Sequence, residues 1–161
     1  MARFNSAHVA VFKKQKILLV QRRDVPLWVL PGGRLEKNES FEQAARRETF
    51  EESGFKVKLL KLIATYTDPQ KKGQKKLFSG QIIGGKTTLN PEAQNISFFA
   101  QNKLPSPMLL FEKKRIMGAF NFTGSAKSYN FHENPTLEIL NQLKNPVIFL
   151  TLLFKYITAR S

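Results

Sequence analysis

The sequence predicts a mixed α/β fold in which helices cover a mixed β-sheet. Short β-branched and leucine-rich runs recur between turn signals, which is typical of strands. Stretches free of Gly and Pro follow helix-starting residues, which is typical of helices. The two kinds of segment do not alternate strictly, which favours a mixed sheet over a purely parallel one. With 161 residues, 42% of them hydrophobic, and no internal repeat or linker, the chain is expected to form a single domain over residues 1–161.

Strands are expected where the apolar runs are short. Residues 8–12 and 16–21 flank a short polar turn, which predicts a hairpin. Further strands are expected at residues 27–30, 57–67, 77–83 and 96–100, with a loop over residues 68–76. The Pro-Gly-Gly stretch at residues 31–33 is predicted to break regular structure.

One helix carries clear start and stop signals. Ser40 and Gln43 have the spacing of a capping box, no Gly or Pro interrupts residues 41–53, and Gly54 stands where a left-handed cap is favoured. Pro is favoured in the first turn of a helix. Two more helices are therefore expected to follow prolines, over residues 107–115 and 135–144.

Half of the acidic residues fall in one short stretch of this basic chain. The chain has 26 Lys plus Arg against 12 Asp plus Glu, a net charge of +14, yet six of the acids lie within residues 36–52. On the predicted helix, Glu48, Glu51 and Glu52 project from one side. Arg47 can pair with Glu51 at i,i+4, which leaves negative charge that a divalent cation would neutralise. Oxygen ligands favour Mg²⁺ or Mn²⁺; an ordinary solvated helix face is the alternative.

Residues 33–55 read GRLEKNESFEQAARRETFEESGF. This string resembles the Nudix box, G-x5-E-x7-R-E-U-x-E-E-x-G-U, in which U is a bulky aliphatic residue. The fixed identities in register are Gly33, Glu39, Arg47, Glu48, Glu51, Glu52 and Gly54. Thr49 and Phe55 depart from the aliphatic preference, which concerns packing and not the presumed metal ligands. The resemblance covers about residues 3–120 and leaves residues 121–161 as a C-terminal helical extension.

The resemblance implies an α/β/α sandwich and hydrolysis of a nucleoside diphosphate linked to a further group X. X then belongs to an ADP-ribose-like compound, a nucleotide sugar or a nucleoside triphosphate. Carried over by position, Glu48, Glu51 and Glu52 would bind Mg²⁺ or Mn²⁺, and Gly33 would add a carbonyl ligand. Arg47 would orient a glutamate. The general base would be either Glu52 or a glutamate beyond the box, where Glu92 is the one acid between residues 77 and 111.

Four further residues are candidates for substrate binding. Phosphate can be bound by Arg22, Arg23 and Lys86, and the guanidinium of an arginine offers bidentate donors for it. The alternative for each residue is an exposed charge at a strand end. Trp28 can stack on a nucleobase, although a Trp beside a Pro-Gly turn is more often a packing residue.

Composition narrows the remaining classes of function. The chain has no cysteine, which excludes disulfides, thiolate metal sites and a cysteine nucleophile. No signal sequence or membrane-spanning run is found, so a cytoplasmic location is expected. The positive charge suits a polyphosphate substrate, and it keeps open an RNA 5′-end substrate or a catalytically idle Nudix module that binds nucleotide or RNA.

A nearly uninterrupted apolar run occupies residues 147–157. As a helix of about 1.5 Å per residue it is too short to cross a bilayer, and its apolar surface must be covered. Packing against its own domain is the first expectation. A homodimer seam and a membrane-surface contact are the alternatives.

Overall fold

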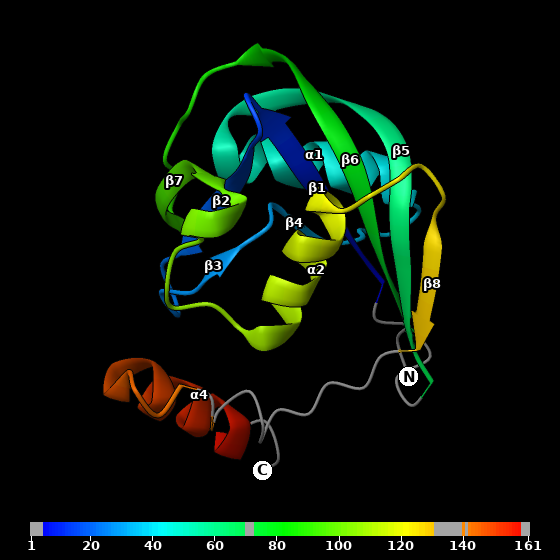
Figure 1. The fold of residues 1–161 in the computed structure, drawn as a ribbon. Coiled ribbons are helices and arrows are strands. Elements are labelled where there is room, and N and C mark those ends of the chain that lie inside the picture. The colour runs from blue at the N-terminus through cyan, green and yellow to red at the C-terminus, as the bar shows by residue number, and fades with distance from the viewer. Residues whose placement is uncertain (1–4, 70–72, 131–139, 141, 159–161) are drawn as a thin grey trace.

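The computed structural model describes residues 5–69, 73–130, 140 and 142–158 (Figure 1). These residues form an eight-stranded mixed sheet, which agrees with the predicted fold class. The strands are β1 (Ser6–Lys13), β2 (Lys16–Arg22), β3 (Trp28–Val29), β4 (Gly32–Arg34), β5 (Phe55–Asp68), β6 (Gly73–Gly85), β7 (Ala93–Ala100) and β8 (Lys127–Asn130). The main path runs β3-β2-β1-β6-β5-β8, while β4 pairs with β1 and β7 with β2. The pairs β1–β6 and β5–β8 are parallel.

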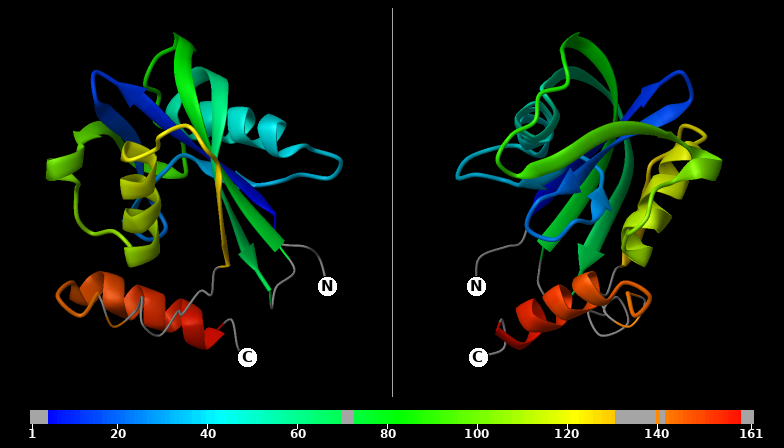
Figure 2. Two further views of the ribbon diagram at one scale, coloured as in Figure 1. Left: turned by 45° about the vertical axis from the view of Figure 1, so that its right-hand side comes forward. Right: turned by 90° about the vertical axis from the view of Figure 1, so that its left-hand side faces the viewer.

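Helices α1 (Phe41–Ser53) and α2 (Leu110–Phe120) lie on opposite sides of the sheet, as the two views of Figure 2 show. A short 3-10 turn, η1 (Gln101–Lys103), precedes α2, and α4 (Pro146–Thr158) ends the described chain. The helices and the sheet form the layers that the family resemblance implies.

Alternating residues of β1 feed two separate cores. Val9 and Val11 join Ala44 and Ala45 of α1 in one buried cluster. Ala10 joins a second cluster, which includes Ile116 and Ala119 of α2. Successive side chains of a strand point to opposite faces, so β1 is buried on both. This central strand therefore connects the packing of α1 to the packing of α2.

Most predicted elements are present, with shifted ends. The hairpin, the helix from Ser40 and the apolar C-terminal helix are confirmed. The expected break at residues 31–33 is wrong in part, because the short strand β4 begins at Gly32 and pairs with β1. Strand β6 begins at Gly73, inside the predicted loop, because it pairs with β5 down to Asp68. The helix expected at residues 107–115 begins later, at Leu110.

The C-terminal region contains one strand that the sequence did not predict and one predicted helix that the described residues do not test. Strand β8 was not predicted; it adds to the sheet in parallel beside β5. The helix expected at residues 135–144 lies mostly outside the described residues. No helix in the described part of the chain combines the length and apolar character needed to cross a bilayer.

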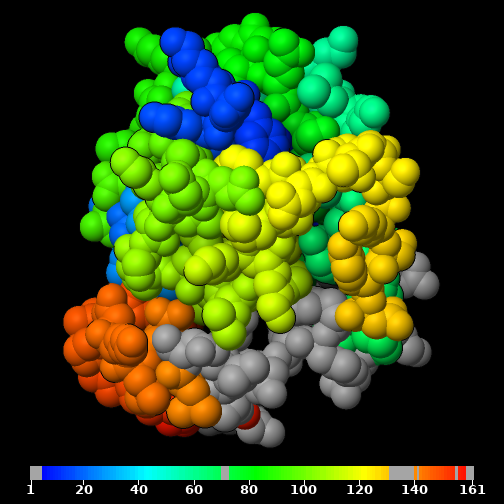
Figure 3. All heavy atoms as spheres, in the orientation of Figure 1, coloured from blue at the N-terminus to red at the C-terminus, as the bar shows by residue number. Residues whose placement is uncertain are grey.

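One face of α4 packs on the domain and the other faces outward. Ile148 is 1% exposed and clusters with Val25 and Leu27, which lie between β2 and β3. Its neighbours at Val147, Leu150, Phe154 and Ile157 expose more than half of their surface. In Figure 3 the orange and red atoms of α4 lie below α2. The expected packing against its own domain is therefore present on one face only.

Candidate active site

Helix α1 is held at both ends by the signals its sequence carries. The Ser40 side chain accepts a hydrogen bond from the Gln43 amide at 3.2 Å, and the Gln43 side chain accepts from the Ser40 amide at 2.8 Å. Gly54 ends the helix with φ of 76°, a conformation that favours glycine. Thr49 is fully buried and donates its hydroxyl to the Ala45 carbonyl at 2.7 Å. These contacts fix the helix face that carries the glutamates.

Arg47 connects the acidic side chains of this helix. Its Nε and Nη2 donate to the two carboxylate oxygens of Glu39 at 2.8 and 2.9 Å. Its Nη1 donates to Glu48 at 2.9 Å and to Glu51 at 3.0 Å. The pairing with Glu51 is the i,i+4 contact expected from the spacing. Because its donors are shared among Glu39, Glu48 and Glu51, the Arg47 guanidinium holds these three carboxylates in defined directions.

The strap, as we name residues 30–33, runs beside these glutamates. The amide of Gly32 donates to Glu52 Oε2 at 2.8 Å. Gly32 has φ of +146°, and a Cβ there would lie 2.3 Å from the Ala7 carbonyl oxygen. A Cβ on Gly33 would lie 2.5 Å from the Glu48 carboxyl carbon. Gly32 is therefore required by its backbone conformation and by space, and Gly33 lets the backbone lie directly against the Glu48 carboxylate.

The two inner glutamates are in an unfavourable place for negative charge. Burial raises the pKa of Glu52 to about 8, although the hydrogen bond from the Gly32 amide acts in the opposite direction. Burial also raises the pKa of Glu48, and its hydrogen bond from Arg47 opposes that shift. Glu51 differs, because its side chain is 53% exposed. The site therefore combines one exposed and two partly or largely buried carboxyl groups.

Arg22 and Glu92 lie close enough to act on this site through their charges. Arg22 at the end of β2 donates two hydrogen bonds to Asp24, at 2.9 and 2.8 Å. Its positive charge favours the ionised form of Glu52, whereas the negative charge of Glu92 disfavours it. Glu92 is exposed. The structure thus brings both residues to the side of α1 that carries Glu52.

Arg23 and Trp28 are engaged with the protein itself. The Arg23 guanidinium donates to the carbonyl oxygens of Pro91 and Ala93, at 2.9 and 3.1 Å. Its backbone amide donates to the Glu92 carbonyl at 2.8 Å. Trp28 is 9% exposed and meets Phe99 edge to face, with ring centroids 4.8 Å apart. Arg23 therefore holds the segment that carries Glu92, and Trp28 packs in the core.

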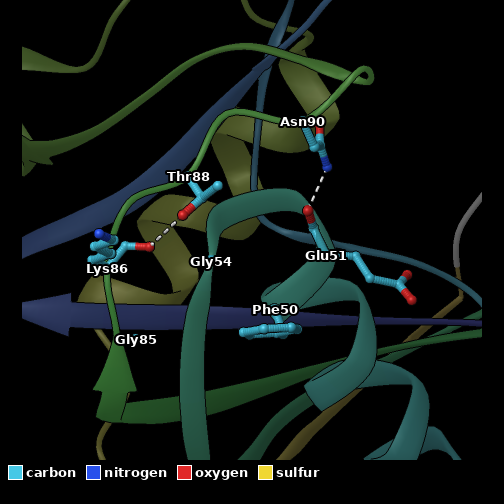
Figure 4. Close-up of a pocket in the computed structure, with 7 residues that line it drawn as sticks. All are labelled: Phe50, Glu51, Gly54, Gly85, Lys86, Thr88 and Asn90. Carbon is cyan, nitrogen blue, oxygen red and sulfur yellow. Dashed lines mark hydrogen bonds between the residues drawn. The ribbon is translucent and has the colours of Figure 1, made fainter.

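Lys86 lines a shallow cavity of about 360 Å³ beside the C-terminal end of α1. Phe50, Glu51, Gly54, Gly85, Thr88 and Asn90 complete its wall (Figure 4). In Figure 4 the Glu51 carboxylate points away from Lys86 and Thr88, so Lys86 and this carboxylate lie on different sides of the cavity wall.

Asn90 is a site residue that the sequence analysis did not identify. Its Nδ2 donates to the Glu51 carbonyl, and its Oδ1 accepts from the amides of Glu92 and Ala93, at 2.9 and 2.6 Å. It ties the Glu92 segment to the end of α1. The adjacent Pro91 is a turn signal, but only the fold shows which helix end this Asn reaches.

The family comparison agrees with this geometry. The NUDIX domain model matches residues 2–117. The chain belongs to the Nudix hydrolase family. A Bacillus subtilis (strain 168) protein named "Putative 8-oxo-dGTP diphosphatase" is 38% identical over 109 residues, which cover 67% of this chain and 73% of that protein. The ADP-ribose pyrophosphatase of Methanocaldococcus jannaschii is 33% identical over 112 residues, 65% of each chain.

Solved structures show the same fold. The crystal structure of an ADP-ribose pyrophosphatase from Streptococcus suis 89-1591 matches with a TM-score of 0.69 and 25% identity, over 79% of this chain and 99% of that one. A UDP-X diphosphatase matches with a TM-score of 0.67 and 26% identity, over 79% and 68%. This Nudix hydrolase is therefore a pyrophosphohydrolase that acts on the diphosphate bonds of nucleotides.

Nudix hydrolases typically use a divalent metal ion. Within the described residues, no three acidic or imidazole groups converge on one point, and Glu48 and Glu51 both face Arg47. The donor set still fits a hard cation, because it consists of carboxylate oxygens. Glu52 is the strongest sign of fit: it is largely buried, and no Lys or Arg of the described segments forms an ion pair with it. A bound cation would stabilise its ionised form.

Proposed function

We propose that this Nudix hydrolase is a Mg²⁺-dependent enzyme that cleaves a nucleoside diphosphate linked to X, with an oxidised nucleoside triphosphate as the first substrate to test. The observation that carries the proposal is the position of Glu48, Glu51 and Glu52 on one helix beside a glycine strap. The name of the Bacillus subtilis relative, an 8-oxo-dGTP diphosphatase at 38% identity, supports this choice of substrate.

In the proposed site, Glu48, Glu51, Glu52 and the Gly33 carbonyl hold the ion. A bound divalent cation lowers the pKa of a water molecule and neutralises phosphate charge. Arg47 orients Glu48 and Glu51 through the hydrogen bonds described above. Arg22 is the proposed phosphate ligand, because its charge acts on Glu52 and its partner Asp24 is exposed, so that a phosphate of higher charge can replace Asp24.

The general base is one of two carboxylates, Glu52 or Glu92. Glu52 has the raised pKa that suits proton transfer near neutral pH, but it is also a proposed metal ligand. Glu92 is exposed and held at the site by Arg23 and Asn90. Replacing Glu92 with Gln separates the two: if Glu92 is the base, kcat falls by about two to four orders of magnitude while metal affinity is unchanged. Near-normal turnover would assign the role to Glu52.

The substrate is tested with a panel of nucleotides in the presence of Mg²⁺. The panel contains 8-oxo-dGTP, dGTP, ADP-ribose, a UDP-sugar and a 5′-triphosphorylated RNA, and mass spectrometry identifies the products. The E51Q variant is run beside the wild type. Cleavage of 8-oxo-dGTP to a monophosphate and pyrophosphate, lost in E51Q, is the expected result.

A second candidate substrate class is ADP-ribose-like. It is supported by the ADP-ribose pyrophosphatase from Methanocaldococcus jannaschii and by the Streptococcus suis structure of the same name. Cleavage of ADP-ribose to AMP and ribose 5-phosphate with no attack on 8-oxo-dGTP would select this class. Nucleotide or RNA binding without Mg²⁺-dependent cleavage of any compound would instead indicate an idle Nudix module.

A further inference from the structure

The strap is tied to the fold by hydrogen bonds at three of its four residues, Leu30, Pro31 and Gly32. On one side, the Gly32 amide donates to Glu52 of α1 at 2.8 Å. In the plane of the sheet, the Val9 amide donates to the Pro31 carbonyl at 2.9 Å. The Leu30 amide donates to Glu112 Oε1 of α2 at 2.6 Å. Two carboxylates on helices of opposite faces therefore hold two amides of the same four-residue segment.

Glu112 belongs to a buried ion pair that lies outside the Nudix box. It is 6% exposed, and its other oxygen accepts from Arg115 Nη1 at 2.8 Å. Arg115 is 3% exposed, and its guanidinium lies 5.7 Å from the centre of the Tyr66 ring and 5.4 Å from that of Phe111. The Nε and Nη2 groups of Arg115 have no hydrogen-bond partner in the described structure.

Stability alone does not account for this pair. A buried ion pair often contributes less than well-packed apolar side chains of the same volume, because both charges lose their hydration. Here the guanidinium also leaves two donors without acceptors, which adds to the cost. What the pair does supply is a carboxylate fixed in one position, with one oxygen on Arg115 and the other on the Leu30 amide.

We propose that Glu112 is a positioning residue of the active site, which acts through Leu30 to fix the strap against Glu48 and Glu52. This inference rests on the proposed metal-binding role of Gly33. Gly33 has no side chain and lies directly against Glu48, so a shift of the strap changes how its backbone meets the glutamates. The hydrogen bond from Arg115 Nη1 holds the Glu112 carboxylate in place, with its other oxygen on the Leu30 amide.

Two double variants separate positioning from stability. Both remove the buried charges: E112Q/R115M keeps a side-chain oxygen for the Leu30 amide, and E112M/R115M does not. Apolar replacement of a buried ion pair is often neutral or stabilising, so both proteins are expected to fold. If E112M/R115M does not fold, E112N/R115M, which is also uncharged and withdraws the side-chain oxygen by one methylene, gives the same comparison in milder form.

Three quantities are measured on each variant: the hydrogen-exchange rate of the Leu30 amide, the affinity for Mn²⁺ alone by calorimetric titration, and kcat on the substrate that the panel identifies. In E112M/R115M we expect faster exchange at Leu30 and Mn²⁺ affinity and kcat each reduced by about 10-fold or more, the effect typical of groups that orient metal ligands. In E112Q/R115M we expect the Leu30 exchange rate and the Mn²⁺ affinity to stay within about threefold of wild type. The melting temperatures of E112Q/R115M and E112M/R115M are expected to be the same.

Equal Mn²⁺ affinity in the two double variants would overturn the proposal, as would slow exchange at Leu30 in E112M/R115M. These readouts do not require turnover. Failure of the wild type to cleave any nucleotide would contradict the proposed function instead, and would leave the exchange and affinity comparison as the test of Glu112.

Discussion

The strap with α1 and the C-terminal helix α4 are attached to the same fold in opposite ways. The strap is held by directional hydrogen bonds: its amides donate to Glu52 and Glu112, and its Pro31 carbonyl accepts from the Val9 amide. Helix α4 is held by apolar contacts of Ile148 and Leu152 with Val25, Leu27 and Leu109. Hydrogen bonds define geometry to a fraction of an ångström, whereas apolar contact is non-directional. The hydrogen bonds of the strap therefore fix the position of its backbone, whereas the contacts of α4 cover apolar surface without fixing an exact geometry.

The largest effect is expected from a substitution in the first region, at the Glu52 side chain that accepts a hydrogen bond from the strap. In Glu52→Gln we expect kcat to fall by about two to four orders of magnitude, because a proposed metal ligand and candidate base is lost. Gln still accepts a hydrogen bond from Gly32 and is a neutral group of similar size that cannot ionise, so the melting temperature is expected to stay level or rise. Turnover kinetics and thermal unfolding are measured together, with Glu42→Gln on the exposed side of α1 as the control. A kcat within tenfold of wild type contradicts the assignment.

The metal-free protein should also report the burial of Glu52 in its pH dependence. Burial raises the pKa of Glu52 to about 8 in the folded state, against an ordinary value of 4.5. The folded state therefore binds this proton more tightly, so its stabilising effect is complete below pH 4.5 and is lost as the pH rises through 8. At about 1.4 kcal/mol per pKa unit, the loss is on the order of 5 kcal/mol.

Urea unfolding of the metal-free protein between pH 4.5 and 9 measures this loss. Other groups titrate in the same range, so the relevant quantity is the difference between the wild type and Glu52→Gln. We expect the free energy of unfolding of the wild type to fall relative to the variant as the pH rises. Parallel profiles would show that Glu52 ionises freely in the fold.

The sequence was informative about α1 because its signals are local. The capping residues Ser40 and Gln43, the cap at Gly54 and the contact of Arg47 with Glu51 all lie within a few residues of each other. The contacts of the strap could not be predicted in this way. Glu112 lies 82 positions from Leu30 and reaches it only because α2 folds back onto the sheet.

Strand β8 and the hydrogen bonds of the Arg23 side chain could not be predicted either, because both depend on residues distant in the sequence. Strand β8 is a short polar segment that exposes all four residues, so it carries no apolar alternation to indicate a strand. It forms because β5 offers a free edge. Arg23 was a candidate for phosphate binding from its residue type alone, and only the fold shows its guanidinium on the carbonyls of Pro91 and Ala93.

The packed face of α4 gives the next prediction. In Ile148→Ala we expect the free energy of unfolding to fall by about 2 to 4 kcal/mol, because the side chain is 1% exposed against Val25 and Leu27. Urea unfolding measures the change, and kcat is expected to stay within threefold of wild type since Ile148 belongs to a separate apolar cluster with Val25 and Leu27. A change below 0.5 kcal/mol would show that α4 does not rest on this surface in solution.

The exposed face of the same helix should give the smallest effect. Phe154 is 68% exposed, so Phe154→Ser is expected to change the free energy of unfolding by no more than about 0.5 kcal/mol in a dilute monomer. Sedimentation and unfolding at several protein concentrations, with Ile148→Ala beside it, measure both stability and mass. A concentration-dependent loss of stability in Phe154→Ser would show that a second copy covers this face, because only an assembled state links stability to concentration. In that case both faces of α4 would be buried, one against its own domain and the other against a second copy of the chain.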